Sequence, residues 1–126
     1  MEYYIGYDLG SSSVKAALID SKTGKSVGVT NYPEKEMTIL SVETGWAEQE
    51  PEIWWKNIGK VTQKLLAQTG ISSDKIKGIG ISYQMHGLVV VDKEAKVLRP
   101  SIIWCDSRAV QIGNDAFNGV GADKCV

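Results

Sequence analysis

The feature that most constrains the fold is a change of hydrophobic period near the middle of the chain. An apolar residue recurs at i, i+4, i+7 and i+11, the spacing of one helix face, at Trp54, Ile58, Val61 and Leu65. Pro51 stands where a first-turn proline belongs, and Gly70 is a plausible C-terminal stop. The spacing therefore predicts a helix over 51–69.

On both sides of this helix the pattern is that of β-strands. Short β-branched or aromatic runs, separated by turn residues, predict strands over 3–7, 14–19, 26–32, 37–42, 76–81, 88–91 and 97–104. The glycines of the 76–81 run indicate close approach of a neighbouring backbone. A last helix is expected from a capping Ser107 through Phe117. The order strands, helix, strands, helix predicts an α/β domain with a mixed sheet and an antiparallel start.

Composition excludes several classes of function. The 126 residues are one domain or a piece of a larger one, and 14 Lys+Arg against 15 Asp+Glu leave a net charge of −1, which argues against a nucleic-acid partner. No apolar run approaches the roughly 20 residues that span a bilayer. We expect no secretory signal, because residues 1–4 have no basic segment followed by an apolar stretch. Cys105 and Cys125 lack metal-ligand spacing, so we expect free thiols in a reducing cytoplasm.

The first candidate site is the turn Asp8-Leu9-Gly10-Ser11-Ser12-Ser13. A turn of this kind aims successive backbone N–H groups at one point and can hold phosphate oxygens. Asp8 could hold a hydrated magnesium ion, because Mg²⁺ keeps several waters and takes few carboxylates. The alternative is a plain hairpin turn with a capping aspartate. Lys15 is expected to point outward from a strand.

The second candidate is Gln84-Met85-His86-Gly87, which contains the chain's one histidine. A histidine that donates or accepts, a methionine that packs on a carbon face and a glutamine with both amide roles suit a hydroxylated ligand. The alternative is a loop histidine whose hydrogen bonds are satisfied within the protein.

The third candidate is Trp104-Cys105-Asp106-Ser107-Arg108. An aromatic face, a carboxylate and a guanidinium within one turn could line a sugar pocket. The alternative is a core tryptophan followed by a helix cap, with an i, i+2 charge pair whose members do not touch.

Taken with two further stretches, these segments resemble the FGGY carbohydrate kinases. The matching stretches occur in the family's order and are 4–15, 45–55, 78–87 and 98–108. Gln84-Met85-His86-Gly87 in particular resembles the xylulokinase branch. Cys105 departs from the more polar residue expected at that position.

The resemblance implies a ribonuclease-H-like, actin-like ATPase lobe that forms one side of a cleft for ATP and a sugar. It implies transfer of the ATP γ-phosphoryl group to a ketopentose such as D-xylulose. By analogy the ATP phosphates face Gly10, Ser11, Ser12, Ser13 and Lys15, with Asp8 near Mg²⁺. The sugar would be contacted by Gln84, Met85, His86, Trp104, Asp106 and Arg108.

The family's catalytic base is an aspartate in a Gly-Gly-Asp segment, and the sequence contains no such segment. We therefore expect residues 1–126 to be an N-terminal portion without the second lobe, inactive by itself and prone to self-association. Alternatives are a kinase for glycerol, gluconate or ribulose, or a non-enzymatic actin-like nucleotide-binding module. A nuclease on the same fold would need several carboxylates around two metals, and only Asp8 is suitably placed.

Overall fold

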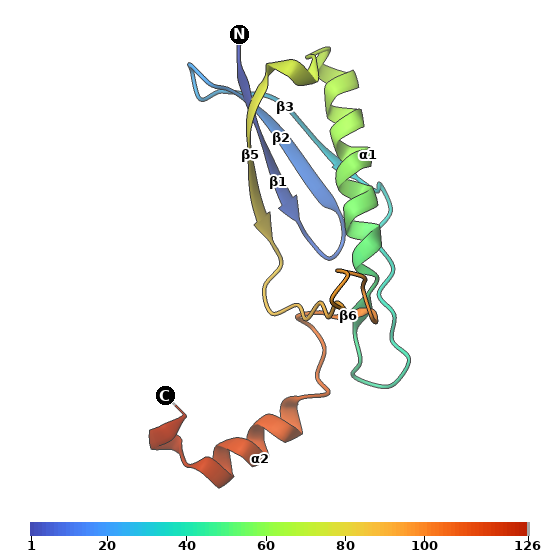
Figure 1. Ribbon diagram of the computed structural model, residues 1–126, viewed down its shortest axis with the longest axis vertical. Helices are drawn as coiled ribbons and strands as arrows, with labels where there is room; N and C mark the ends of the chain where they lie inside the picture. Colours follow the sequence, from blue (N-terminus) through green and yellow to red (C-terminus); the bar gives the residue numbers. More distant parts are fainter. Residues whose placement is uncertain (126) are drawn as a thin grey trace.

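The computed structural model describes residues 1–125, which form a four-stranded mixed sheet, a two-stranded ribbon and two α-helices (Figure 1). The large sheet has the order β3-β2-β1-β5 and contains β1 (Tyr3–Leu9), β2 (Val14–Asp20), β3 (Ser26–Tyr32) and β5 (Ile76–Tyr83). Neighbours β1, β2 and β3 are antiparallel, whereas β5 runs parallel to β1. The ribbon pairs β4 (Glu48–Gln49) with β6 (Ser101–Ile102). The predicted mixed sheet with an antiparallel start is confirmed.

The long helix α1 (Pro51–Thr69) has the predicted ends. Pro51 occupies the first turn, where its missing N–H costs no hydrogen bond, and Glu52 lies beside the positive end of the helix dipole. Gly70 takes φ 68° and its N–H donates to the carbonyl of Leu66. A left-handed residue at this position ends a helix with little strain only when it lacks a Cβ.

One face of α1 packs on β2 and β3, and the main core lies between them. Ile5, Val14, Leu18, Val61 and Leu65 are 0–2% exposed. Burying each such side chain stabilises the fold by about 1.5–3 kcal/mol. The helix approaches β3 at Gly28, where a Cβ would lie 2.5 Å from Cγ2 of Thr69.

Two of the predicted strands are wrong, and a third is much shorter than predicted: of the segment 97–104, only Ser101–Ile102 is a strand. Segment 37–42 forms only an isolated bridge from Leu40 to Glu48, because the N–H of Met37 donates to the loop carbonyl of Ser12 instead. Segment 88–91 forms only isolated bridges and is largely exposed. No element of the described chain covers it, so its apolar run does not reflect burial.

The last helix begins later than predicted. α2 spans Val110–Val120, and none of its residues is buried. Ser107 does not cap it, since the Ser107 hydroxyl donates to the carbonyl of Gly45. Two 3₁₀ turns, η1 (Ser73–Lys75) and η2 (Ala122–Lys124), complete the described chain. Figure 1 shows α2 projecting away from the sheet and α1.

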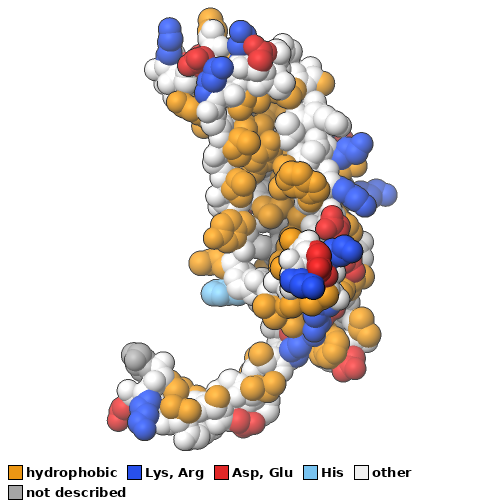
Figure 2. Space-filling model, in the orientation of Figure 1, with side chains coloured by type: hydrophobic (Ala, Val, Ile, Leu, Met, Phe, Trp, Pro, Cys, Tyr) orange, Lys and Arg blue, Asp and Glu red, His pale blue; other side chains and the backbone are white. Residues whose placement is uncertain are grey.

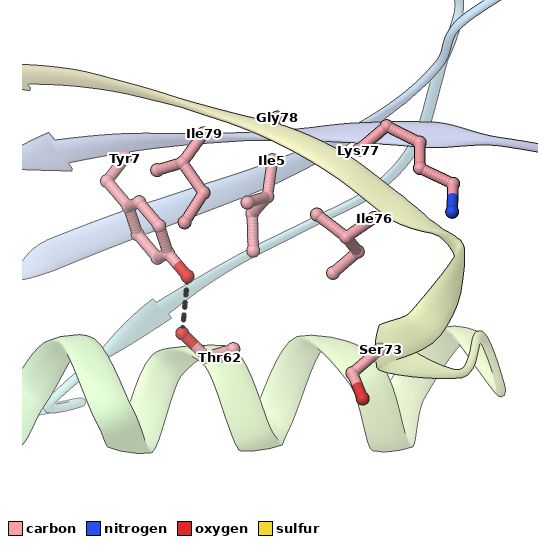
Figure 3. Close-up of a pocket in the computed structure, with 8 residues that line it drawn as sticks. All are labelled: Ile5, Tyr7, Thr62, Ser73, Ile76, Lys77, Gly78 and Ile79. Carbon is pink, nitrogen blue, oxygen red and sulfur yellow. Dashed lines mark hydrogen bonds between the residues drawn. The ribbon is translucent and has the colours of Figure 1, made fainter.

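The side of the sheet at β5 is left open. Ile79 and Ile81 stand in register with the buried Ile5 and Tyr7, yet they are 68% and 59% exposed. Figure 3 shows Ile79 beside the groove between β5 and α1, where the hydroxyls of Tyr7 and Thr62 are 2.6 Å apart. Hydrophobic side chains gather along this face of the molecule in Figure 2. The fold thus presents an apolar sheet edge to solvent.

Candidate functional site

The first two candidate loops meet at one edge of the sheet. Asp8 and Leu9 are in parallel register with Ser82 and Tyr83, so the loops that follow β1 and β5 leave the sheet side by side. The N–H of Gln84 donates to the carbonyl of Leu9 at 3.0 Å. Ligands of open α/β sheets bind at such carboxyl ends of parallel strands.

In the loop that follows β1 (Gly10–Ser13), three of the four carbonyl oxygens accept hydrogen bonds from protein donors. Ser11 O accepts from Nε2 of Gln49 at 2.6 Å, Ser12 O from the N–H of Met37 at 2.8 Å, and Ser13 O from the N–H of Gly10 at 3.2 Å. Across residues 1–125, the N–H groups of Ser11 and Ser12 donate to no protein acceptor. A loop with occupied carbonyls and free N–H groups is suited to an anion.

Asp8 and Lys15 flank this loop as cross-strand partners. Nζ of Lys15 lies 3.8 Å from Oδ2 of Asp8, and both side chains are more than half exposed. An exposed pair of this kind adds little to stability, and both groups remain accessible to a ligand. The 125 described residues hold no cluster of three metal-ligating side chains. A single accessible carboxylate fits a magnesium ion that keeps most of its waters.

The loop that follows β5 carries Gln84, Met85 and His86, which line a pocket of about 280 Å³ together with Trp104. A neighbouring pocket of about 190 Å³ is lined by Gln84 and His86 along with Leu9 and other residues. His86 has φ 61°, a left-handed conformation that is uncommon for a residue with a Cβ. Such strain clusters at ligand sites, where the surrounding structure enforces it.

The polar side-chain groups of Gln84 and His86 lack partners in the part of the chain that the structure describes. Both amide atoms of Gln84 are enclosed and make no hydrogen bond. Because enclosed polar atoms are nearly always paired, this amide points to a partner that belongs to a ligand or to water. His86 is exposed and makes no side-chain hydrogen bond either, so the alternative of an internally satisfied histidine is not supported.

Trp104 links the two loops. Its indole Nε1 donates to the hydroxyl of Ser11 at 3.2 Å, while its ring lines the pocket of Met85 and His86. The side chain is 59% exposed, so the alternative of a core tryptophan is wrong. Trp104 follows β6 at the point where the chain leaves the ribbon and turns toward the β1 loop.

Asp106 and Arg108 are not among the residues that line this pocket, and their side chains are only 3% and 17% exposed. Arg108 donates from Nη2 to the carboxylates of both Asp106 and Glu48 at 2.7 Å, and its guanidinium stacks 3.8 Å above the ring of Trp46. The expectation of an i, i+2 pair without contact is wrong, because these residues lie in a turn before α2. Hydrogen bonds from Arg108 hold the pKa of Asp106 well below its usual range, against the opposing effect of burial.

Glu48 and Gln49, the two buried polar residues of β4, were not predicted to belong to the site. Glu48 pairs with Arg99 and Arg108, and Gln49 bonds both the Gly10–Ser13 loop and the indole of Trp54. Their position in the sequence could have indicated this role, because these two polar residues stand between an alanine and the first turn of the predicted helix.

Comparisons with known proteins identify the family of this chain. Residues 3–123 match the FGGY family of carbohydrate kinases, N-terminal domain. The chain is 39% identical over 108 residues to a xylulose kinase of Klebsiella pneumoniae. This match covers 86% of this chain and 21% of that protein. The chain therefore spans about a fifth of the length of the curated relatives that it matches.

Solved structures give the same result. A ligand-bound xylulose kinase from Lactobacillus acidophilus superposes with a TM-score of 0.84 at 31% identity, over 98% of this chain and 24% of that one. A gluconate kinase from the same species reaches a TM-score of 0.80 at 30% identity, over the same shares. The predicted actin-like lobe is confirmed, and the chain belongs to the FGGY family of carbohydrate kinases.

Proposed function

We propose that this chain supplies the sugar-binding floor and one phosphate loop of a kinase that transfers the γ-phosphoryl group of ATP to a ketopentose such as D-xylulose. The observation that carries the proposal is the meeting of the two loops, through Gln84 and Leu9 and through Trp104 and Ser11. A phosphoryl donor and a sugar hydroxyl must be held in line, and catalysis of this transfer is mainly positioning and charge neutralisation.

The sugar side is assigned to Gln84, Met85, His86 and Trp104. The unpartnered amide of Gln84 and the free imidazole of His86 can exchange hydrogen bonds with hydroxyl groups. Met85 and the Trp104 ring offer apolar surface to the carbon face of a sugar. Asp106 and Arg108 were also expected to contact the sugar; here we propose that they fix the turn behind Trp104.

The phosphate side is assigned to Gly10, Ser11, Ser12 and Ser13, with Lys15 and Asp8 at its rim. The free N–H groups of the loop would hold phosphate oxygens, and the Lys15 ammonium would add positive charge. Asp8 would hold Mg²⁺ through its waters, and that ion would neutralise charge on the phosphates.

The substrate is proposed within a class rather than fixed by the fold. The xylulose and gluconate kinases match this chain at similar TM-scores, so gluconate, ribulose and glycerol stay in the test panel. Within the described residues no helix is long and apolar enough to cross a membrane. Cys105 and Cys125 are both free thiols, which supports a reducing cytoplasm.

The experiment is a chimera in which this chain replaces the matching fifth of the Klebsiella xylulose kinase. We expect sugar-dependent ADP release with D-xylulose to exceed that with glycerol, gluconate or ribulose. Release with another sugar alone would move the substrate within the class. A folded chimera that binds ATP but does not release ADP with any of the sugars tested would instead support a non-enzymatic nucleotide-binding module.

A further inference from the structure

We propose that Gln49 is a positioning residue of this site: it aims the N–H groups of the Gly10–Ser13 loop and, through Ser11, orients Trp104. This inference rests on the proposed function for its link to phosphate and sugar, but its geometry can be tested separately. Gln49 lies on β4, outside the segments that carry the candidate ligand contacts.

The Gln49 side chain is 2% exposed, and both ends of its amide are engaged. Nε1 of Trp54 donates to Oε1 of Gln49 at 3.1 Å. Nε2 of Gln49 donates to the carbonyl of Ser11 at 2.6 Å and, at 3.5 Å, to that of Thr38. Because an indole N–H can only donate and a carbonyl can only accept, the amide has one orientation that satisfies both sides.

The backbone of Gln49 is itself held on rigid elements. It pairs with Ser101 in the β4–β6 ribbon and stands two residues before Pro51, the first residue of α1. Trp54, its partner, lies in the first turns of that helix and is 9% exposed. A group mounted in this way can hold the Gly10–Ser13 loop with precision.

The consequence for the loop follows from the planarity of the peptide bond. The carbonyl of Ser11 and the N–H of Ser12 belong to one trans peptide and point in opposite directions. Turning the Ser11 carbonyl toward Gln49 therefore turns the Ser12 N–H away from the protein, where it has no acceptor among residues 1–125. In the same way, the hydrogen bond from the N–H of Met37 to the Ser12 carbonyl turns the N–H of Ser13 to the opposite side of that peptide.

The same serine passes the constraint to the sugar pocket. The Ser11 hydroxyl accepts a hydrogen bond from Nε1 of Trp104, whose ring lines the pocket of Met85 and His86. Gln49 thus acts on both halves of the site without touching either ligand. It fixes the direction of the phosphate-side N–H and the orientation of the sugar-side indole.

The test uses ¹⁵N-labelled 126-residue chain and the variant Gln49→Glu. This change keeps an acceptor for Trp54 and replaces the donor that faces the Ser11 carbonyl, so it breaks the loop side selectively. We expect the Ser12 amide and the Trp104 indole resonances to shift in the folded variant. We also expect affinity for MgATP, followed at the loop amides, to fall by about tenfold, the scale of losing an aligned charged hydrogen bond.

Two further variants keep the proposal falsifiable if Gln49→Glu does not fold. Ser11→Ala removes the hydroxyl but leaves the carbonyl that Gln49 bonds, so it should shift the Trp104 indole and not that of Trp54. Gln68→Glu places the same change at an exposed glutamine of α1. It should shift neither the Ser12 amide nor the Trp104 indole resonance.

Unchanged Ser12 and Trp104 signals in folded Gln49→Glu, or an unchanged Trp104 signal in Ser11→Ala, would overturn the positioning role. The failure of the proposed function looks different. In that case wild-type chain would respond to neither MgATP nor D-xylulose, and the variant shifts would describe a loop with no kinase role.

Discussion

The carbonyl of Leu9 accepts a hydrogen bond from the N–H of Gln84 at 3.0 Å, which joins the end of β1 to the end of β5. These two residues begin the loops to which the phosphate and the sugar are assigned. Their contact extends the parallel pairing of the strands by one step beyond the sheet. The distance between the two half-sites is therefore set by strand pairing rather than by loop flexibility.

Replacing His86 should weaken sugar binding selectively. In the chimera, His86→Ala is expected to raise the KM for D-xylulose by about tenfold, the scale of losing one or two hydrogen bonds. The KM for ATP should change little, because His86 belongs to the loop to which the proposal assigns the sugar and not to the Gly10–Ser13 loop. Steady-state kinetics check this, with Lys93→Ala in an exposed turn as the control. Equal changes in both KM values would contradict the assignment.

Truncating the core should destabilise the fold without touching the site. Leu65 is fully buried between α1 and the sheet, so Leu65→Ala is expected to lower the free energy of unfolding by about 2–5 kcal/mol. Leu98→Ala, at a residue 60% exposed, is the matched control and should change it far less. Urea unfolding followed by circular dichroism measures both. Similar losses for the two variants would show that the core is misplaced.

The Asp106–Arg108 pair should make stability depend on pH in the acid range. Hydrogen bonds from Arg108 depress the pKa of Asp106 in the folded chain, so the unfolded chain takes up the proton first as the pH falls. The stabilisation is complete above the unfolded pKa of about 4 and is lost as the pH falls below it. Asp106→Asn should therefore cost more stability at pH 6 than at pH 3.

Urea unfolding at the two pH values measures this difference, with Asp123→Asn, at an exposed residue, as the control. A cost for Asp106→Asn that is the same at both pH values would mean that the carboxylate charge is not engaged in the folded chain.

The open edge of β5 should drive self-association. Residues 78–83 form an edge without charge or proline, and Ile79 and Ile81 are exposed. Long apolar edges of this kind pair with other strands. Light scattering over a concentration series should show a rising mass for wild type and a monomer for Ile79→Lys. Val29→Lys, on the opposite edge strand β3, should behave as wild type. A monomeric wild type at high concentration would refute this prediction.

The elements that could be predicted from the sequence are those whose conformation depends on residues close by in the chain. The ends of α1 follow from Pro51 and Gly70, and the three-stranded antiparallel start follows from local turns. Prediction from the sequence failed where distant packing decides: the 88–91 run has a strand composition, but none of the described residues covers it. It also failed for the local contact of Asp106 with Arg108, which depends on the conformation of the turn that holds them.

The candidate site could likewise be predicted only in part, namely for the loops whose own residues indicate a chemical role. The loops of Asp8 and His86 carry recognisable chemistry, and parallel pairing of their strands brings them together. Gln49 has no such chemistry of its own. Its role depends on a partner 38 residues earlier in the chain, which only the fold reveals.

The meeting of a phosphate loop and a sugar loop can be tested directly by a ¹⁵N NMR titration of the 126-residue chain with D-xylulose and then with MgATP. We expect the sugar to shift the amides of 84–87 and the indole of Trp104, and MgATP to shift the amides of 10–13. Shifts confined to another face of the molecule, or no shift with either ligand at saturating concentration, would contradict this expectation.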